Sequence, residues 1–384
     1  MNATALRALT VAALLLASHA QQGAHALPEA IVDKEDHYLD ISEWLVDRKG
    51  FLPVPIIITE PAVGNGFGLA LMFMRNSMRE SARKAQESGL QVAPDVWVVG
   101  AAATENGTKA AFAGGMASFD EGKWKYRGGL GRADVNLAFY GSGSMLGGGG
   151  GIDYSLDGWM SSQQALRRLG ASDNWLGFRW IYMDLNSQLD ISGNPAAGLM
   201  PDQVTRKASG LGLTLEHDSR DNIFTPSRGW TAALDAMFYD PDWGSDTHFQ
   251  SYRGHVFAYW PINKALVLGG RLDGRSVNGR TPFYMLPFID MRGIPAARYQ
   301  DDNTAVAETE LRWNFTPRWG AVAFIGAGRA WGTTRTFDEA PSAVSKGLGL
   351  RYLLARRLGL WIGVDYAKGP EDGTVYLQIG NAWH

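Results

Sequence analysis

The chain has 384 residues, including 47 glycines and no cysteine, and its formal net charge is −3. The lack of cysteine excludes a disulfide framework and a thiolate metal site, and the near-neutral charge argues against a nucleic-acid-binding protein. After the N-terminus no run of about 18 or more apolar residues occurs, so we expect no transmembrane helix. Abundant glycine and aromatic residues in many short alternating segments instead indicate an all-β chain.

The first 26 residues have the features of a secretory signal peptide. Arg7 supplies a positive charge, and Ala8–Ala17 (ALTVAALLLA) is an apolar run too short to span a bilayer. Small-x-Ala cleavage sites end at Ala20 and Ala26. We therefore expect an exported protein whose leader is removed after one of these alanines; an N-terminal helix that anchors the chain is the weaker alternative.

Residues 27–50 form a short polar and acidic segment. Ile41, Trp44 and Leu45 recur at the i, i+3, i+4 spacing of one helix face, so a short amphipathic helix is predicted here.

From residue 51 onward the pattern predicts sixteen strands. Lengths near ten residues suit tilted strands that cross a bilayer. The predicted strands are residues 51–60, 66–74, 95–104, 109–120, 123–140, 151–164, 175–190, 208–218, 230–240, 248–260, 265–278, 304–315, 320–330, 345–354, 358–368 and 374–383.

Several of these strands alternate apolar and polar residues. A soluble sandwich would turn the apolar face inward, whereas a membrane barrel turns it to lipid and lines its lumen with polar groups. Arg271, Asp273 and Arg275 share one face and are easier to explain as lumen residues. In strand 208–218, leucines on one face alternate with Gly212, Thr214 and Glu216 on the other. In strand 265–278, leucines alternate with Gly269 and the three charged residues. In strand 358–368, leucine, isoleucine and valine alternate with Gly359, Gly363 and Asp365.

The connections alternate between short and long, as expected for short periplasmic turns and long outer loops. The connections 75–94 and 105–108 do not fit this alternation. Aromatic residues near strand ends are candidates for interfacial girdles. The short turns are 120–122, 261–264, 316–319 and 355–357. The long loops are 141–150, 191–207, 279–303 and 331–344. The aromatic candidates are Trp97, Trp124, Tyr140, Trp159, Trp175, Trp230, Trp260, Trp313, Trp319 and Trp383.

Two segments carry a resemblance to a known family. His217–Trp230 (HDSRDNIFTPSRGW) packs several turn formers between two strands, and its Asp218, Arg220, Asp221, Pro226 and Gly229 resemble the family's D-x-R-D-x-x-x-x-P-x-x-G turn. Met291–Trp313 (MRGIPAARYQDDNTAVAETELRW) resembles the family's loop motif and the strand after it. The family is BamA/TamA, also called the bacterial surface antigen family.

The resemblance implies a single transmembrane antiparallel β-barrel of sixteen strands in the bacterial outer membrane, covering residues 51–384. Residues 27–50 are too short for a POTRA domain and are interpreted as a periplasmic segment. The loop between the eleventh and twelfth strands is expected to be extracellular and to fold back into the lumen. The last strand, Thr374–His384, resembles the terminal signal for barrel insertion, although the usual last residue is Phe or Trp and this chain ends Trp383-His384.

The resemblance also implies a set of lumen contacts, called here the lumen lock: Arg292, Gly293, Glu308 and Glu310. Arg292 is expected to pair with acidic lumen residues, best matched by Glu310, and Gly293 to let the loop approach the wall closely. The family places a second acid on the thirteenth strand, where this chain has Gly326. Glu308, Glu216 and Asp273 are the candidate substitutes; alternatively the loop is held less firmly.

Two functions remain open from the sequence. The first is assembly or translocation of proteins or lipids at the outer membrane, through a weak seam between the first and last strands; Pro53 and Pro55 cannot donate ladder hydrogen bonds there. The second is a pore or structural barrel that works with a lipoprotein or periplasmic partner. Outer-membrane lipids and a protein client are the other partners that the resemblance implies.

Other signals are weaker. Gly147–Gly151 lacks the lysine of a phosphate-binding loop, and Asn106-Gly107 indicates a hairpin turn. No histidine has metal-ligand spacing, so we expect no metal and no cofactor. A barrel hydrolase would draw its base from His217, His248 or His255 and its nucleophile from Ser219 or Ser276, but no G-x-S-x-G elbow supports it, so an enzyme is not the favoured interpretation.

Overall fold

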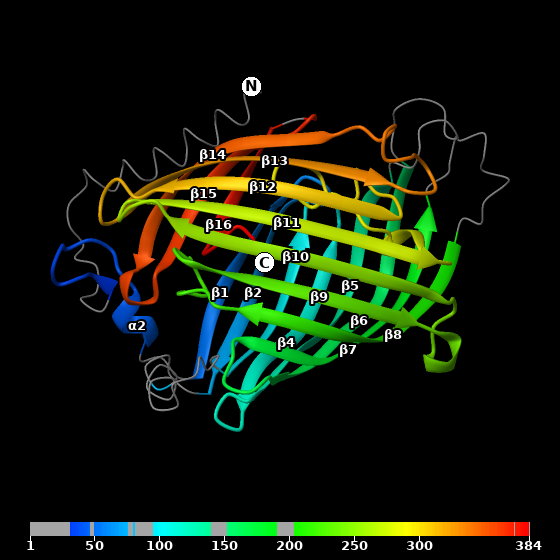
Figure 1. Cartoon of the computed structure of the whole chain (residues 1–384), viewed down its shortest axis with the longest axis horizontal. Coiled ribbons are helices and arrows are strands. Elements are labelled where there is room, and N and C mark those ends of the chain that lie inside the picture. Colours follow the sequence, from blue (N-terminus) through cyan, green and yellow to red (C-terminus); the bar gives the residue numbers. More distant parts are fainter. Residues whose placement is uncertain are drawn as a thin grey trace.

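The computed structural model describes residues 31–46, 50–75, 80, 95–139, 152–189, 203–371 and 373–383. One sheet of sixteen antiparallel strands curls into a barrel, and each strand pairs with its neighbours in the sequence (Figure 1). The strands are β1 (Gly50–Glu60), β2 (Gly64–Met74), β3 (Val96–Thr104), β4 (Lys109–Phe119), β5 (Trp124–Phe139), β6 (Ile152–Arg168), β7 (Asn174–Leu189), β8 (Gln203–Asp218), β9 (Gly229–Tyr239), β10 (Phe249–Pro261), β11 (Leu266–Gly279), β12 (Asn303–Trp313), β13 (Trp319–Trp331), β14 (Ala343–Ala355), β15 (Leu360–Lys368) and β16 (Gly373–Ile379).

The predicted all-β barrel of sixteen strands is confirmed, with two notable corrections to strand bounds. β8 begins at Gln203, five residues before the predicted start, because its pairing with β7 continues without a break as far as Gln203. β16 ends at Ile379 instead of residue 383. Gly380 has a φ of 76°, and this left-handed turn directs the residues after it away from the wall.

Several predicted features lie outside the described residues. They are the signal peptide at 1–26, the loops 141–150 and 191–202, the glycine run Gly147–Gly151, Tyr140, His384 and most of the connection 75–94. Within the described part of the chain, no helix is long and apolar enough to cross a bilayer.

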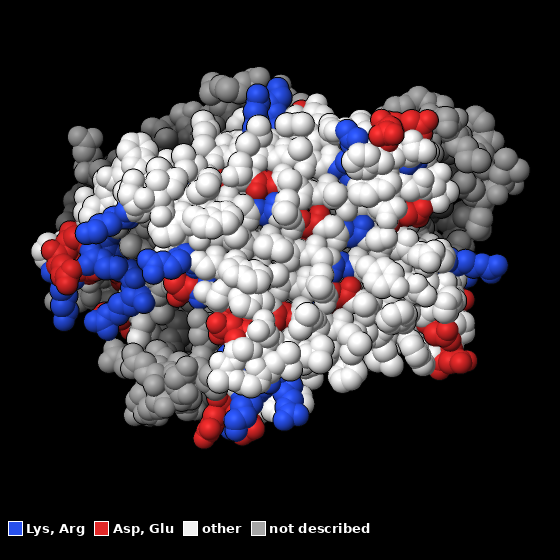
Figure 2. Space-filling model, in the orientation of Figure 1, with Lys and Arg blue, Asp and Glu red and all other residues white. Residues whose placement is uncertain are grey.

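The barrel wall alternates as the sequence predicts. Along β8, Leu211, Leu213 and Leu215 are exposed on the outside, whereas Thr214 and Glu216, which alternate with them, are buried inside. Along β11, Leu272 is exposed and Arg271 is buried. Figure 2 shows mostly uncharged side chains across this face of the barrel, with a dense group of charges at the end that carries the N-terminal segment. An apolar exterior around a charged interior is the pattern of a barrel surrounded by lipid.

Two of the aromatic residues predicted for interfacial girdles lie inside the barrel instead. Trp175 is buried beneath the cations of Lys125 and Arg168, which lie 4.1 and 4.2 Å from its ring centroid. Trp383 is buried against Phe257 and Tyr259 because the chain turns inward after β16. Other candidates are exposed on the wall: Trp97, Trp124, Trp159, Trp230, Trp260 and Trp313.

The barrel has a seam where its first and last strands meet. β1 and β16 lie next to each other, but within the described strands no hydrogen-bonded ladder joins them. The strands also differ in length, with eleven residues in β1 and seven in β16. The sheet is therefore closed by its curvature and by contacts other than a continuous ladder.

The N-terminal segment, residues 31–46, packs against one end of the barrel. Its helix α2 (Ser42–Val46) places Leu45 in a buried cluster with Leu52 of β1 and Ala355 at the end of β14. The backbone N–H of Ile41 also donates to the carbonyl of Leu354 at 2.9 Å. The segment therefore contacts strands from both sides of the seam.

An acidic clamp fixes this segment to the turn between β12 and β13. Arg318, only 2% exposed, donates to Asp33 and Asp36 at 2.7 Å and to Asp40 at 2.6 Å. The hydrogen bond from Arg318 lowers the pKa of Asp36 to about 2, so its carboxylate stays ionised at neutral pH. Arg356, in the turn before β15, adds ion pairs with Glu35 and Asp36.

We predict that Arg318→Ala releases the N-terminal segment. The substitution leaves three carboxylates near one another without their shared cation, at a local cost of about 3 kcal/mol. Hydrogen–deuterium exchange of residues 31–46 in the detergent-folded barrel should accelerate by up to roughly 100-fold. The matched control is Arg357→Ala, which removes an exposed pair with Glu43 and should change exchange little. Unchanged exchange in the Arg318 variant would contradict the clamp.

Candidate functional site

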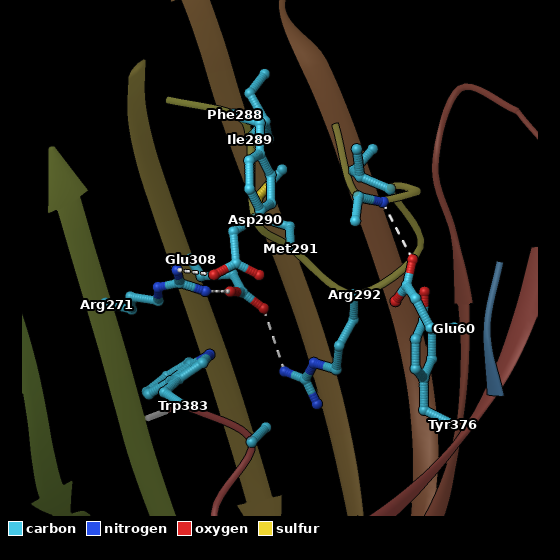
Figure 3. A pocket seen from close by; sticks show the side chains of 13 residues that line it. Glu60, Arg271, Phe288, Ile289, Asp290, Met291, Arg292, Glu308, Tyr376 and Trp383 are labelled. Atoms are coloured by element: carbon cyan, nitrogen blue, oxygen red, sulfur yellow. Dashed lines mark hydrogen bonds and ion pairs between the residues drawn. The ribbon is translucent and has the colours of Figure 1, made fainter. Parts of the chain in front are cut away.

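The loop between β11 and β12, residues 280–302, folds back into the barrel and carries the candidate site. Ile289, Met291 and Ile294 of the loop are buried in one cluster with Val306 of β12 and Ala343 of β14. Figure 3 shows Phe288 to Arg292 following one another along the loop, beside β-strands of the wall (Figure 3). Burial of these apolar side chains favours the folded-back path, since it removes them from water.

Arg292 lies at the centre of a group of lumen carboxylates. Its guanidinium is 2.8 Å from Glu310, 3.3 Å from Glu308 and 2.8 Å from Asp365, and the arginine is 8% exposed. The ring of Phe324 on β13 lies 3.6 Å below the cation. Guanidinium groups suit such a site because their several N–H donors can serve more than one carboxylate at once.

β13 carries no acid at the expected position, which is Gly326, and Asp365 of β15 supplies a carboxylate instead. Gly326 of β13 pairs with Glu308, and a Cβ at Gly326 would lie 2.5 Å from Cγ of Glu308 and 2.9 Å from Sδ of Met291. The space that a side chain at position 326 would occupy is thus filled by the lock and the loop. Asp365 of β15 reaches Arg292 from the other side.

Of the three candidate substitutes, only Glu308 contacts Arg292. Glu216 pairs with Lys125 and Arg127 of β5, and Asp273 with arginines of β10 and β11. Sequence reasoning missed Asp365 as a partner, although its strand pattern did place it on the polar face. Which polar residues of distant strands face each other across a lumen depends on the curvature of the barrel, which strand patterns do not contain.

Neighbouring arginines extend the lock into a chain of alternating charges. Arg351 of β14 donates to Asp365 at 2.9 Å, and Arg271 of β11 donates to Glu308 at 3.2 Å. The Arg271–Glu308 contact is visible in Figure 3. On the loop itself, Asp290 pairs with Arg275 at 3.0 Å. The buried carboxylates are therefore shared between cations from the wall and the cation from the loop.

Gly293 has the backbone conformation and position that only glycine satisfies easily. Its φ is 83°, and an added Cβ would lie 2.9 Å from Oγ of Ser345 and 3.1 Å from the backbone nitrogen of Gly369. Ser345 also hydrogen-bonds the carbonyl of Arg292. Glycine therefore lets the loop tip rest directly against the wall next to the lock.

The second motif forms the turn between β8 and β9, residues 219–228, and its residues bind one another. Arg220 and Asp218 make two hydrogen bonds of 2.8 Å, and Asp221 accepts from the backbone N–H groups of Ser227 and Arg228. Gly229 has a φ of 91°, and a Cβ there would lie 2.3 Å from the carbonyl oxygen of Ser219.

This turn also contacts distant parts of the barrel. The carbonyl of the buried Pro226 accepts a hydrogen bond of 2.6 Å from Arg312 of β12, two residues after Glu310. Asn222 donates to the carbonyl of Leu358, before β15, at 2.8 Å. β12 thus touches both motifs, one through Glu308 and Glu310 and the other through Arg312.

The residues considered for a hydrolase are partly brought together. Nε2 of His217 lies 3.0 Å from Oγ of Ser219, and its Nδ1 lies 2.9 Å from Asn174. However, the N–H groups of Ser219 and Arg220 already bond Trp230 and Asp218, so they do not form an oxyanion hole. The ring of Trp230 also stacks on His217 at 3.9 Å. We interpret the arrangement as part of the turn's own hydrogen bonding.

The other hydrolase candidates lie apart in different contacts. His248 pairs with Asp240 at 2.9 Å, His255 stacks on Phe257, and Ser276 donates to Asn303 at 2.7 Å. Among the described residues, no group of three acidic or histidine side chains is arranged to hold a metal ion.

Comparisons with known proteins agree with this architecture. The Omp85 superfamily domain matches residues 201–383. BamA from Haemophilus ducreyi lacking POTRA domains 1–3 is similar in structure, with a TM-score of 0.57 and 12% identity over 86% of this chain and 70% of that chain. CdiB from Escherichia coli gives a TM-score of 0.58 and 14% identity over 85% of this chain and 61% of that chain. CdiB from Acinetobacter baumannii gives 0.52 and 12%, over 86% and 59%.

No curated protein sequence matches the chain. Identities of 12–14% establish a shared fold, and the chain spans 59–70% of the length of these three structures. The BamA-like barrel fold that the resemblance implies is thus confirmed, and residues 201–383 match the Omp85 superfamily domain.

We predict that Arg292→Ala lowers the temperature at which the detergent-folded barrel unfolds on a gel. The substitution leaves Glu308, Glu310 and Asp365 buried near one another, at a cost of about 3–5 kcal/mol. The matched control is Arg132→Ala, which removes an ion pair with Asp157 that is more than 40% exposed on both sides and should cost about 1 kcal/mol or less. An unchanged transition in the Arg292 variant would show that these ion pairs do not hold the loop.

Proposed function

We propose that this BamA-like barrel, with its Omp85 superfamily domain, acts at the bacterial outer membrane in the assembly or translocation of other proteins. The observation that carries the proposal is the seam: within the described strands, no ladder joins β16 to β1. Both strands therefore keep unpaired backbone groups, which another chain can bind by strand addition. Pro53 and Pro55 lower the number of backbone N–H donors that β1 has.

In this proposal the lumen lock has a supporting role. It fixes the loop of residues 280–302 to the wall by ion pairs to β12 and β15. The loop then keeps its place while the seam strands move. We assign the chain no chemical reaction, since the Ser219–His217 pair has its neighbouring donors engaged.

A second candidate function is a pore, or a structural barrel that works with a lipoprotein or periplasmic partner. The observation that favours it is the exposure of side chains on the inward face, away from the lock. Met116 of β4 is 38% exposed and lies opposite Arg127, which binds Glu216 inside the barrel, and Ser162 of β6, two residues before the buried Gln164, is also exposed. Water therefore reaches this side of the lumen.

The test of assembly uses the purified barrel in liposomes. An unfolded eight-stranded outer-membrane barrel serves as the client, and its folding is followed by its altered migration on unheated gels. We expect the client to fold several-fold faster than in liposomes without the protein or with an unrelated barrel of similar size. No acceleration, together with a wide and stable conductance in planar bilayers, would reject assembly and favour the pore.

We also propose that the chain reaches the outer membrane through a cleaved signal peptide. Ala20 and Ala26 both end small-x-Ala sites. N-terminal sequencing of the protein recovered from outer membranes should therefore begin at Gln21 or Leu27. A mature chain that retains Arg7 would contradict cleavage.

Mild-detergent purification followed by mass spectrometry would identify a lipoprotein or periplasmic partner.

A further inference from the structure

The seam needs contacts from outside the sheet, because β1 and β16 share no ladder among the described strands. The loop of residues 280–302 supplies such contacts. Beyond Arg292 it runs along the inner side of the last strands and reaches the end of the first strand. Its backbone is thus placed to bind both strands of the seam.

On the β16 side, the loop binds a tyrosine. The backbone N–H of Gly293 donates to the hydroxyl of Tyr376 at 2.9 Å. Further along the loop, the hydroxyl of Tyr299 and Nε of Arg298 donate to Glu371, in the turn between β15 and β16, at 2.6 and 2.9 Å. The last strand is therefore attached to the loop at Tyr376 and at its preceding turn.

On the β1 side, the loop binds a glutamate. The backbone N–H of Ala296 donates to Oε1 of Glu60, the last residue of β1, at 3.1 Å. Figure 3 shows Glu60 and Tyr376 next to each other on one flank of the loop, with the hydrogen bond to Glu60 drawn. Residues 293 and 296, three apart in the loop, thus bind opposite sides of the seam.

We propose that Glu60 and Tyr376 are positioning residues through which the lumen loop holds the β1–β16 seam closed. The proposal deepens the proposed function, on which its biological meaning rests, because it identifies what must be released before the seam opens. We name the two hydrogen bonds, Gly293–Tyr376 and Ala296–Glu60, the seam clasp.

The clasp is weaker than the anchor that holds the loop. Arg292 is fixed by buried ion pairs to two strands, and removing one partner of such a pair leaves an uncompensated charge. The clasp consists of single hydrogen bonds to Glu60 and Tyr376, which are only half-buried, so water can replace each bond one for one. When the structure is strained, the clasp should therefore open while the loop remains docked.

The other end of the seam has its own bridge. Leu45 of the N-terminal segment packs against Leu52 of β1 and Ala355 of β14. The clasp lies near the opposite end of β1, at Glu60. Release of the clasp should therefore separate the strands near Glu60 first.

The test measures the width of the seam directly. The chain has no cysteine, so cysteines placed at Ile57 of β1 and Leu377 of β16, both exposed on the outer wall, take nitroxide labels selectively. Pulsed electron paramagnetic resonance then gives the distance distribution in lipid nanodiscs. In Glu60→Ala combined with Tyr376→Phe, we expect a new population whose distance is longer by at least about one inter-strand spacing, ~5 Å.

Matched variants separate the clasp from general loosening of the loop. Asp290→Asn removes the negative charge through which the loop pairs with Arg275 of β11 and should keep the unmodified distribution. Glu60→Gln, with Tyr376 unchanged, retains an oxygen acceptor for the backbone N–H of Ala296. This variant should keep the short distance that the double variant loses. Each labelled variant is first shown to be folded by its migration on an unheated gel, and Tyr376→Phe alone replaces the double variant if that one does not fold.

The outcomes distinguish this inference from the proposed function, since the distance measurement needs no client. An unchanged distribution in the folded clasp variant would overturn the clasp, even if the barrel accelerates client folding. An equal broadening in Asp290→Asn would also overturn it, because the effect would then belong to the loop as a whole. A longer population confined to the clasp variant would support it, even if client folding is not accelerated.

Discussion

The need to neutralise buried charge in the lumen organises this barrel. Arg292 is the loop's contribution to that balance: it lies among Glu308, Glu310 and Asp365, whose side chains are at most 12% exposed. Charges removed from water are tolerated only when they are paired. The loop cannot leave without exposing an imbalance in the wall, and the wall carboxylates hold it in one position. The path of residues 280–302, and the contacts it makes with both ends of the sheet, follow from this pairing.

This lock differs from the expected one in the strand that carries the second acid. With glycine at position 326, the space beside Glu308 is taken by Met291 of the loop. In addition to Glu308 and Glu310, Asp365 of β15 meets Arg292, and Arg351 also binds this carboxylate. β15 is the neighbour of β16, so the ion pair fixes the loop one strand away from the seam. An anchor close to the seam and two hydrogen bonds across it give a loop that can stay docked while the strands beside it separate.

Much of the fold was predictable because strand alternation and turn chemistry are local. The side-chain period of two identified the outward leucines of β8 and the inward charges of β11, since each depends only on neighbours along the chain. The ends of strands were less predictable: β16 stops at Ile379 because the chain turns inward at Gly380, and Trp383 is buried for the same reason. Within the lock, Arg292, Glu308 and Glu310 lie on segments resembling known motifs, whereas Asp365 lies outside both.

The sequence by itself determined an all-β barrel of sixteen strands, the polar and apolar faces of its wall, and the arginine that enters the lumen. These properties follow from periodicity and from short motifs. Only the tertiary structure decided which carboxylates meet Arg292, that the N-terminal segment binds Arg318, and that one loop reaches both Glu60 and Tyr376. The contacts of Arg292 with Asp365, of the N-terminal segment with Arg318, and of the loop with Glu60 and Tyr376 join residues between 73 and 285 positions apart. Their partners are selected by the closure of the sheet, which brings opposite walls together in ways that no local pattern encodes.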